Sequence, residues 1–214
     1  METEWIETET EIDTVDWRGN PIHLIGVRAL KNSKTGRIRV YPYDIAKAEV
    51  RDIAKKFGIE PRDVGAFLLI LAKPGPFKGG EVLYKYHLQK LLFYLWKDLG
   101  KSGYGEALTR EDFLAAATGP VPKNLDEDLE NFKKKNWIEI RPHRWNNHTS
   151  KRIILTKEGL QLTKELWDSI PDPYKEVAQK VKERIYPLDP ETIRHLVHKE
   201  YPEYRDTYIE NDVE

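Results

Sequence analysis

The sequence of 214 residues contains no cysteine and only one methionine. The absence of cysteine excludes disulfides, thiolate-bound zinc, iron–sulfur clusters and thiol catalysis. The longest apolar run, at 64–72, is far shorter than the roughly 18 residues of a membrane-spanning helix. The N-terminus is rich in glutamate and lacks the basic and apolar regions of a secretory signal. We therefore expect a cytoplasmic protein with no membrane segment.

Charged residues, in contrast, are abundant: they make up 33% of the chain, beside 39% hydrophobic residues. The hydrophobic share is sufficient for a packed core, so the composition favours a folded protein. Many lysines and glutamates with little cysteine and methionine are typical of hyperthermophile proteins. An ordinary charged cytosolic protein is the alternative.

The net charge of −1 hides an uneven distribution along the chain. Residues 1–16 contain seven acids and no lysine or arginine, which leaves a net charge of +6 for residues 17–214. Such asymmetry is typical of a basic body with an acidic arm. We interpret 1–16 as an arm that is flexible and solvated.

A first folded unit is predicted over 17–73. Two β-rich runs, at 22–30 and 37–41, flank a turn cluster and predict a hairpin. Residues 44–57 carry an apolar stripe of helical period, and the apolar run at 64–72 predicts a second, buried helix. Prolines and glycines in 74–82 indicate a linker after this unit.

The second half, 83–168, shows the order helix, short helix, helix, strand, basic turn, strand, helix. The short helix is expected to begin with a capping box at Thr109 and to run to Ala117, and the next helix with a similar box at Asn124. This order is typical of a winged helix-turn-helix domain. Two more helices are predicted in 169–214. The predicted fold class is α+β and mostly helical, with an N-terminal β-hairpin-plus-helix unit, a winged-helix core and a C-terminal helical extension.

The basic turn, which we call the wing, is the most informative local feature. Between residues 133 and 152 the net charge is +6, with histidine, asparagine and tryptophan interleaved. Such a patch suits phosphate, because cationic side chains displace condensed counterions and polar ones add hydrogen bonds. The candidate DNA contacts in this segment are Lys133, Lys134, Lys135, Arg141, Arg144, Lys151 and Arg152. The alternative is a solvated turn whose charge aids solubility.

The candidate recognition helix weakens a DNA reading. Its first turn holds Asp126, Glu127 and Asp128, which would repel phosphate unless the helix end is turned away. Acids at the N-terminus also complement the helix dipole without any ligand. Lys123 and Asn124, just ahead of this helix, remain candidate base contacts.

Catalytic and metal templates are poorly matched. His195 and His198 are three positions apart on a predicted helix, but no third ligand stands at a fixed spacing. The Gly100-Lys101-Ser102 segment lacks the preceding glycine and strand of a phosphate-binding loop. We expect no metal, no cofactor and no enzymatic activity.

Three segments resemble the Panacea domain, an antitoxin-associated family that includes SocA-like proteins. They are the helix at 88–95, the Gly-Pro-Val turn at 119–121 and the closing segment at 193–202, in that order. The later segments are also similar to uncharacterised archaeal winged-helix proteins, through the helix start at 155–159 and the Tyr-Pro-Glu-Tyr at 201–204. The resemblance covers about 83–205. It implies an antitoxin or regulator that acts through protein contacts, sometimes with DNA, and no catalytic residues.

Two functions remain open at this stage. The first is a transcriptional regulator that binds double-stranded DNA through the wing, as a homodimer matched to a palindromic site. The second is an antitoxin-like module that binds a protein partner and does not contact DNA.

Overall fold

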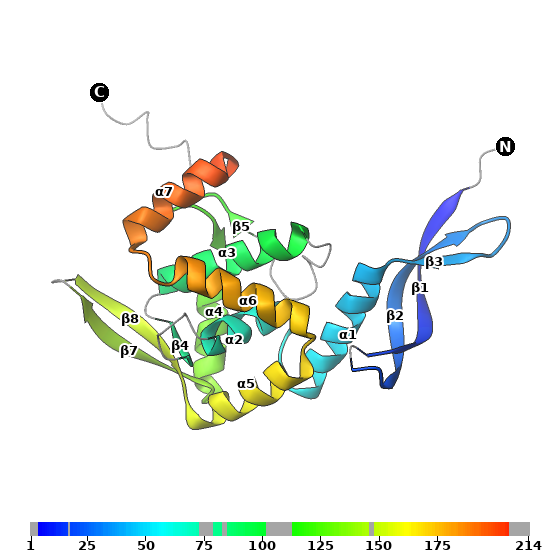
Figure 1. Cartoon of the computed structure of the whole chain (residues 1–214), viewed down its shortest axis with the longest axis horizontal. Helices are drawn as coiled ribbons and strands as arrows, with labels where there is room; N and C mark the ends of the chain where they lie inside the picture. The colour runs from blue at the N-terminus through cyan, green and yellow to red at the C-terminus, as the bar shows by residue number, and fades with distance from the viewer. Residues whose placement is uncertain are drawn as a thin grey trace.

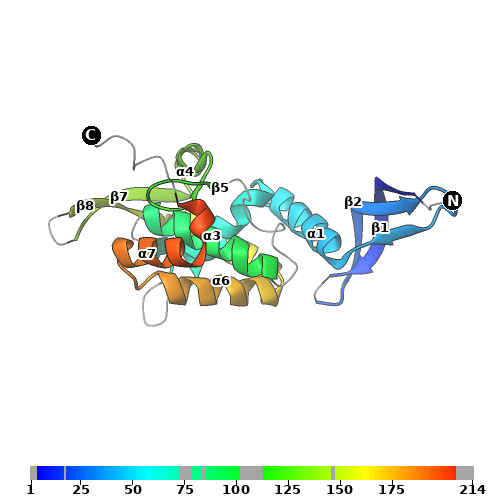
Figure 2. The same ribbon diagram turned by 90° about the horizontal axis from the view of Figure 1, so that it is seen from above.

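The computed structural model describes residues 4–16, 18–72, 79–82, 85–101, 113–145 and 148–205, with only the backbone course at 144, 145 and 148–150. A small N-terminal sheet projects from one end of a larger and mainly helical body, so the molecule is elongated (Figures 1 and 2). The α+β class and the predominance of helix are confirmed.

The described elements follow one another from the N-terminal sheet to the C-terminal helices. In chain order they are β1 (Trp5–Val15), β2 (Pro21–Asn32), β3 (Ile38–Val40), α1 (Pro42–Lys56), η1 (Pro61–Asp63), α2 (Val64–Leu71), β4 (Glu81–Val82), α3 (Lys85–Lys101), β5 (Phe113–Leu114), β6 (Val121–Pro122), α4 (Leu125–Lys134), β7 (Ile138–Trp145), β8 (His148–Leu155), α5 (Lys157–Ser169), α6 (Asp172–Ile185), α7 (Pro190–Glu200) and η2 (Pro202–Tyr204).

The acidic N-terminal segment is a strand and not a flexible arm, which corrects the prediction for 1–16. β1 pairs with β2 in antiparallel register from Trp5 opposite Asn32 to Val15 opposite Pro21. Acids alternate with threonine and isoleucine along β1, so its pattern has the period of two that a strand requires. Asp16 closes the following turn, because its carboxylate accepts the backbone N–H groups of Arg18 and Asn20.

One face of the sheet is covered by α1, as the predicted hairpin and helix require. Leu24 and Val27 of β2 are buried together with Ala48 of α1, and Ile12 and Val40 pack against them. Arg51 of α1 donates hydrogen bonds to the backbone carbonyls of Ile25 and Gly26 in β2. The sheet therefore has its own small core, separate from that of the body.

The body is built around α2, the helix predicted from the apolar run. Phe67, Leu68, Leu69 and Ile70 are fully buried, and α2 contacts α3, α5 and α6. Burial of each such side chain contributes about 1.5–3 kcal/mol, so this short helix is a main anchor of the core. The prediction of a central, buried helix at this position is confirmed.

A buried lysine donates hydrogen bonds to a backbone carbonyl at the end of α2. Lys182 of α6 is fully buried, and its Nζ donates to the carbonyl oxygens of Ile70 at 2.8 Å and Glu81 at 3.0 Å. Burial lowers the pKa of Lys182 to about 7. This side chain thus joins α6, α2 and β4 at one point.

The two wing strands, β7 and β8, form a three-stranded sheet with β4 in the order β4-β8-β7. Glu81 and Val82 were predicted as part of a linker, but they pair with Ile154 and Ile153. After the wing, Thr156 caps α5 as predicted, since its hydroxyl accepts the backbone N–H of Gly159 at 3.0 Å. Two further predicted helices, α6 and α7, are confirmed, and Asp189 caps the latter.

The expected short helix between α3 and α4 is wrong over its described part. Phe113 and Leu114 are a strand that pairs with Val121 and Pro122, while Thr109 and Asp112 lie outside the described residues. The capping box at Asn124 is also wrong, because Asn124 has a left-handed φ of 56° and makes no side-chain cap. The described residues therefore do not confirm the helix-turn-helix pair, which stays a prediction.

No helix among the described residues is both long enough and apolar enough to cross a membrane.

Candidate functional site

The three segments at 88–95, 119–121 and 193–202 meet in space. The first is the middle of α3, the second leads into β6, and the third is most of α7. Lys90 of α3 donates from Nζ to the carbonyl oxygen of Pro120 at 2.7 Å. This contact brings two segments 30 positions apart against each other inside the core.

Gly119 allows the third segment to approach. Its φ is +84°, and a Cβ there would lie 3.1 Å from Cγ1 of Val197 and 3.6 Å from both Nε2 of His198 and Nζ of Lys90. Any larger residue would press on α7 and strain its own backbone. We call the group Lys90, Gly119, Pro120 and His198 the motif nucleus.

The motif nucleus is buried, and burial shifts the pKa values of the side chains in it. Lys90 is fully buried, its Nζ lies 4.9 Å from the ring centroid of Tyr86, and burial lowers the pKa of Lys90 to about 7. Burial likewise raises the pKa of Tyr86 to about 12, so this phenol is neutral at physiological pH. Its hydroxyl donates to the carbonyl oxygen of Thr118 at 3.3 Å.

His198 adds a second perturbed base to the nucleus. Burial lowers the pKa of His198, and the positive charges of Arg205, Arg194 and Lys90 lower it further. Its Nε2 is buried and makes no hydrogen bond within the described part of the chain. The nucleus therefore favours neutral forms of its bases, which suits a packed structural core better than a charge-binding pocket.

Aromatic packing holds the C-terminal end of the third segment. Phe93 of α3 lies about 5 Å, centroid to centroid, from Tyr201 and Tyr204, and Lys97 stands over both tyrosine rings. Arg184 of α6 forms an ion pair with Glu200 at 2.5 Å. Tyr201 and Tyr204 therefore fasten the end of this segment to α3.

The wing cations on the strands are largely tied to acids. Arg141 pairs with Glu139 on the same strand at 2.5 Å. Arg152 pairs with Glu81 of β4 at 3.5 Å and contacts His143 at 3.1 Å. Lys151 is exposed and has no acidic partner among the described residues. Arg144 lies in β7, but its side chain is outside the described part.

Of the lysines at the end of α4, some have partners within the fold and one is exposed without an acidic partner in the described part of the chain. Lys133 lies 3.5 Å from Glu130. Lys135 donates to the carbonyl oxygen of Gly58 and stands 4.4 Å from the ring centroid of Trp137. Lys134 is exposed and lines a cavity of about 430 Å³ between α4 and the segment around Gly58. The candidate cations therefore do not form one continuous free patch in the described structure.

Two of the three acids in the first turn of α4 are paired with cations. Asp126 pairs with Lys85 at 2.5 Å, and the buried Asp128 pairs with Arg62 at 3.3 Å. Lys123 and Asn124 are exposed in the turn just before them. Asp126 and Asp128 thus have partners within the fold. Their presence in α4 is explained by these ion pairs and does not require a ligand.

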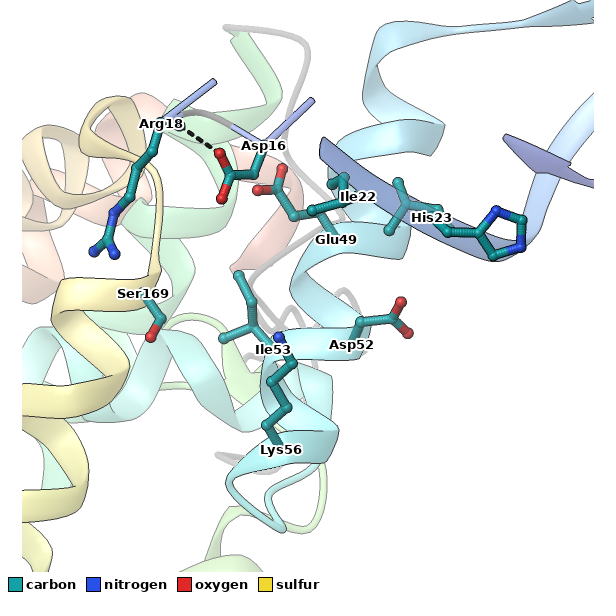
Figure 3. A pocket seen from close by; sticks show the side chains of 10 residues that line it. Asp16, Arg18, Ile22, His23, Glu49, Asp52, Ile53, Lys56 and Ser169 are labelled. Atoms are coloured by element: carbon teal, nitrogen blue, oxygen red, sulfur yellow. Dashed lines mark hydrogen bonds between the residues drawn. The ribbon is translucent and has the colours of Figure 1, made fainter. Parts of the chain in front are cut away.

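A charged cavity of about 410 Å³ separates the N-terminal sheet from the body. In Figure 3, Arg18 and Ser169 stand on one side of it, and His23 and Asp52 on the other. Arg18 also donates to the carbonyl oxygen of Asp168 at the end of α5. Within the described residues, no group of three or more potential metal ligands occurs here or elsewhere.

The model of one protein family, Antitoxin SocA-like, Panacea domain, matches residues 88–203, which is more than half of the chain. The chain belongs to this family. The Panacea match begins within α3 and ends within η2, so it contains the whole motif nucleus and the wing. The resemblance drawn from the three short segments is confirmed in this respect.

The Panacea match leaves the N-terminal sheet, α1 and α2 outside it. Neither the curated proteins nor the solved structures contain a significant match to this chain. The signals that sequence reasoning missed are the buried Lys90 and the strand β1. An alternation of acid with threonine marks β1, whereas Lys90 looks like any other polar residue on a helix.

Proposed function

We propose that this chain is an antitoxin-like module that acts by binding a protein partner. Membership of the Panacea family over 88–203 is the observation that carries the proposal. The motif nucleus supports it, because a tightly packed and buried junction suits a rigid scaffold that presents surfaces. The proposal assigns the chain a binding role and no catalytic step.

The charge arrangement of the described residues also favours protein binding over DNA binding. Arg141 and Arg152 are held by acids, and two of the three first-turn acids of α4 are held by cations. A surface that neutralises itself releases few counterions from a phosphate backbone, so its affinity for nucleic acid is weak.

The test uses the tagged full chain, purified from its source cells with nuclease at about 0.15 M salt, where attraction between nearby charges is retained. We expect one partner protein to co-purify with the chain. Light scattering should show the two proteins at a fixed stoichiometry. We also expect that this protein alone slows the growth of a host cell, and that co-expression of the chain restores growth. A chain that purifies alone, or a partner without any effect on growth, would contradict an antitoxin role.

A transcriptional regulator remains a second candidate, because Lys134 and Lys151 are exposed cations with no acidic partner among the described residues. In this reading the wing contacts double-stranded DNA, and β7–β8 serves as the wing of a divergent winged helix of the archaeal kind. The homodimer prediction belongs to this candidate and is tested by light scattering.

Fluorescence anisotropy with a mixed duplex DNA separates the two candidates. The native chain would be compared with the Arg144→Glu/Lys151→Glu/Arg152→Glu variant across about 50–200 mM salt. Binding that falls steeply with salt and is lost in the variant supports the regulator. Failure of both proteins to bind at the lowest salt removes it.

A further inference from the structure

The N-terminal sheet has a long open edge along β1. The order of its strands is β1-β2-β3, and α1 contacts β2, so within the described residues no strand or helix pairs with the outer edge of β1. Figure 1 shows β1 on the side of β2 away from α1 and from the body. An edge strand presents unpaired N–H and C=O groups that another strand can bond.

The side chains of β1 give this edge a definite charge. Glu7, Glu9, Glu11 and Asp13 occupy alternate positions and share one face of β1, while β1 contains no basic residue. On the neighbouring strand, Arg28 pairs with Glu7. His23 contacts Asp13 at 2.8 Å and Glu11 at 3.4 Å. Glu9 lies near Arg51 of α1, because both side chains stand 3.4–3.6 Å from the place that a Cβ would take at Gly26. Four carboxylates against two arginines and one histidine leave this face of the strand pair with a net negative charge.

The same sheet also exposes apolar side chains. Of the seven large hydrophobic residues exposed in the described part of the chain, six lie in the sheet or directly beside it: Trp5, Ile6, Val15, Ile25, Ile38 and Tyr41. Val15 and Ile25 are each 59% exposed. If the acids of β1 served only to prevent aggregation, exposed apolar residues beside them would work against that role. A cluster of exposed apolar residues is instead typical of an interaction site.

The alternating charge decides what can pair with β1. A second copy of β1 would place carboxylates opposite carboxylates, and like charges in cross-strand pairs are destabilising. A strand with lysine or arginine at alternate positions would instead place a cation opposite each acid. The occupant that fits is therefore a basic, extended segment of another protein.

We propose that the open edge of β1 binds a basic extended segment of the protein partner as a fourth strand of the N-terminal sheet. The inference rests on the proposed partner-binding function and names the surface that Panacea membership leaves unassigned. Main-chain hydrogen bonds along the edge supply affinity, and the charge pairs select the segment.

The test measures binding of a labelled peptide to the full chain by fluorescence anisotropy, at about 0.05 M salt. The probe is as long as β1 and alternates lysine with threonine. One control peptide has glutamate in place of lysine, and a second keeps the lysines but carries N-methyl groups at every backbone nitrogen. The N-methyl control keeps the charge and removes the backbone donors from both edges of the strand.

Two protein variants complete the design. Glu9→Lys/Glu11→Lys reverses charge on β1, and the matched control Glu176→Lys/Glu183→Lys makes the same change on the exposed face of α6. We expect the lysine peptide to bind the native chain and the α6 control equally. We expect at least a tenfold loss with the β1 variant and with each control peptide.

Equal binding of the N-methylated peptide would overturn the proposal, because the attraction would then be charge alone. Absence of binding by the lysine peptide would overturn it as well. The partner from the purification described above gives the separate readout. If it binds the β1 variant as tightly as the native chain, this edge is not its site, although the proposed function stands. If no partner exists, the proposed function itself fails.

Discussion

Lys90 and Pro120 are joined by a hydrogen bond of 2.7 Å from the ammonium Nζ to the backbone carbonyl, deep in the core. A lysine in this position must be desolvated, and its neighbours within hydrogen-bonding reach are neutral. The contact therefore links the packing of the Panacea segments to the protonation of one side chain.

The two buried lysines predict a dependence of stability on pH. Burial lowers the pKa of both Lys90 and Lys182 from 10.5 to about 7. Between about pH 7 and pH 10 the unfolded chain holds protons that the folded chain has released, so the free energy of unfolding rises with pH. At 1.36 kcal/mol per pKa unit, each lysine contributes on the order of a few kcal/mol over this window.

Urea unfolding of Lys90→Met and Lys182→Met across this pH range checks the prediction. Each substitution should flatten part of the rise, and the two together most of it. The exposed Lys180→Met is the control and should keep the native slope. Equal slopes in all five proteins (native, two single variants, the double variant and the control) would show that neither lysine titrates in this window.

The close packing around Gly159 predicts that one added methyl group would strongly destabilise the fold. A Cβ at this position would lie 1.8 Å from the backbone carbonyl oxygen of Trp137, which cannot move aside without breaking the start of α5. We expect Gly159→Ala to lower the free energy of unfolding by about 3 kcal/mol or more. Gly100→Ala in α3, where the methyl group meets nothing within 4 Å, should leave stability equal or slightly raised. A small effect at Gly159 in denaturant unfolding would contradict the packing described.

His23 predicts a titration that reports on the acidic face of the N-terminal sheet. Its hydrogen bond to Asp13 is the largest cause that raises the pKa of His23 above 6.5, and the charges of Asp13 and Glu11 add to it. A raised pKa means that the folded state gains from protonation below the unfolded pKa and loses this gain as pH rises. In an NMR titration, Asp13→Asn should lower the pKa of His23, whereas Asp172→Asn on α6 should not change it.

The helices with clear apolar stripes could be predicted from sequence, because period and burial agree in them. β1 was missed since its inward positions are mostly threonine, and seven acids in the segment suggested solvent. The short helix ending at Ala117 was wrong because Phe113 and Leu114 pair with β6, and no local pattern reports that pairing. Asn124 matched a capping sequence, yet a left-handed backbone turns its side chain away from that role.

In the candidate site, too, local motifs could be predicted from the sequence, whereas long-range contacts could not. The three Panacea segments were identifiable as motifs, but their meeting at Lys90 depends on contacts with residues 30 and more positions away. The cations at 133–135 were correctly placed at the end of a helix, but Arg141, Arg144 and Lys151 were expected in a turn and instead lie on β7 and β8. Their ion pairs were not foreseen, because Arg152 meets Glu81 only when β4 joins β8.

Gly119 allows the packing of the motif nucleus to be separated from backbone strain. Alanine at Gly119 must adopt a φ of +84° and also press on Val197 at 3.1 Å. Alanine at Gly36 must adopt a φ of +69°, but its methyl group meets nothing within 4 Å. The difference between the two substitutions in free energy of unfolding therefore measures the contact of this turn with α7. We expect Gly119→Ala to be the more destabilising by about 1–3 kcal/mol. If α7 and the turn form the rigid scaffold of the proposed function, Gly119→Ala should also weaken binding of the partner, whereas Gly36→Ala should not. Equal losses of stability would show that the turn does not constrain α7.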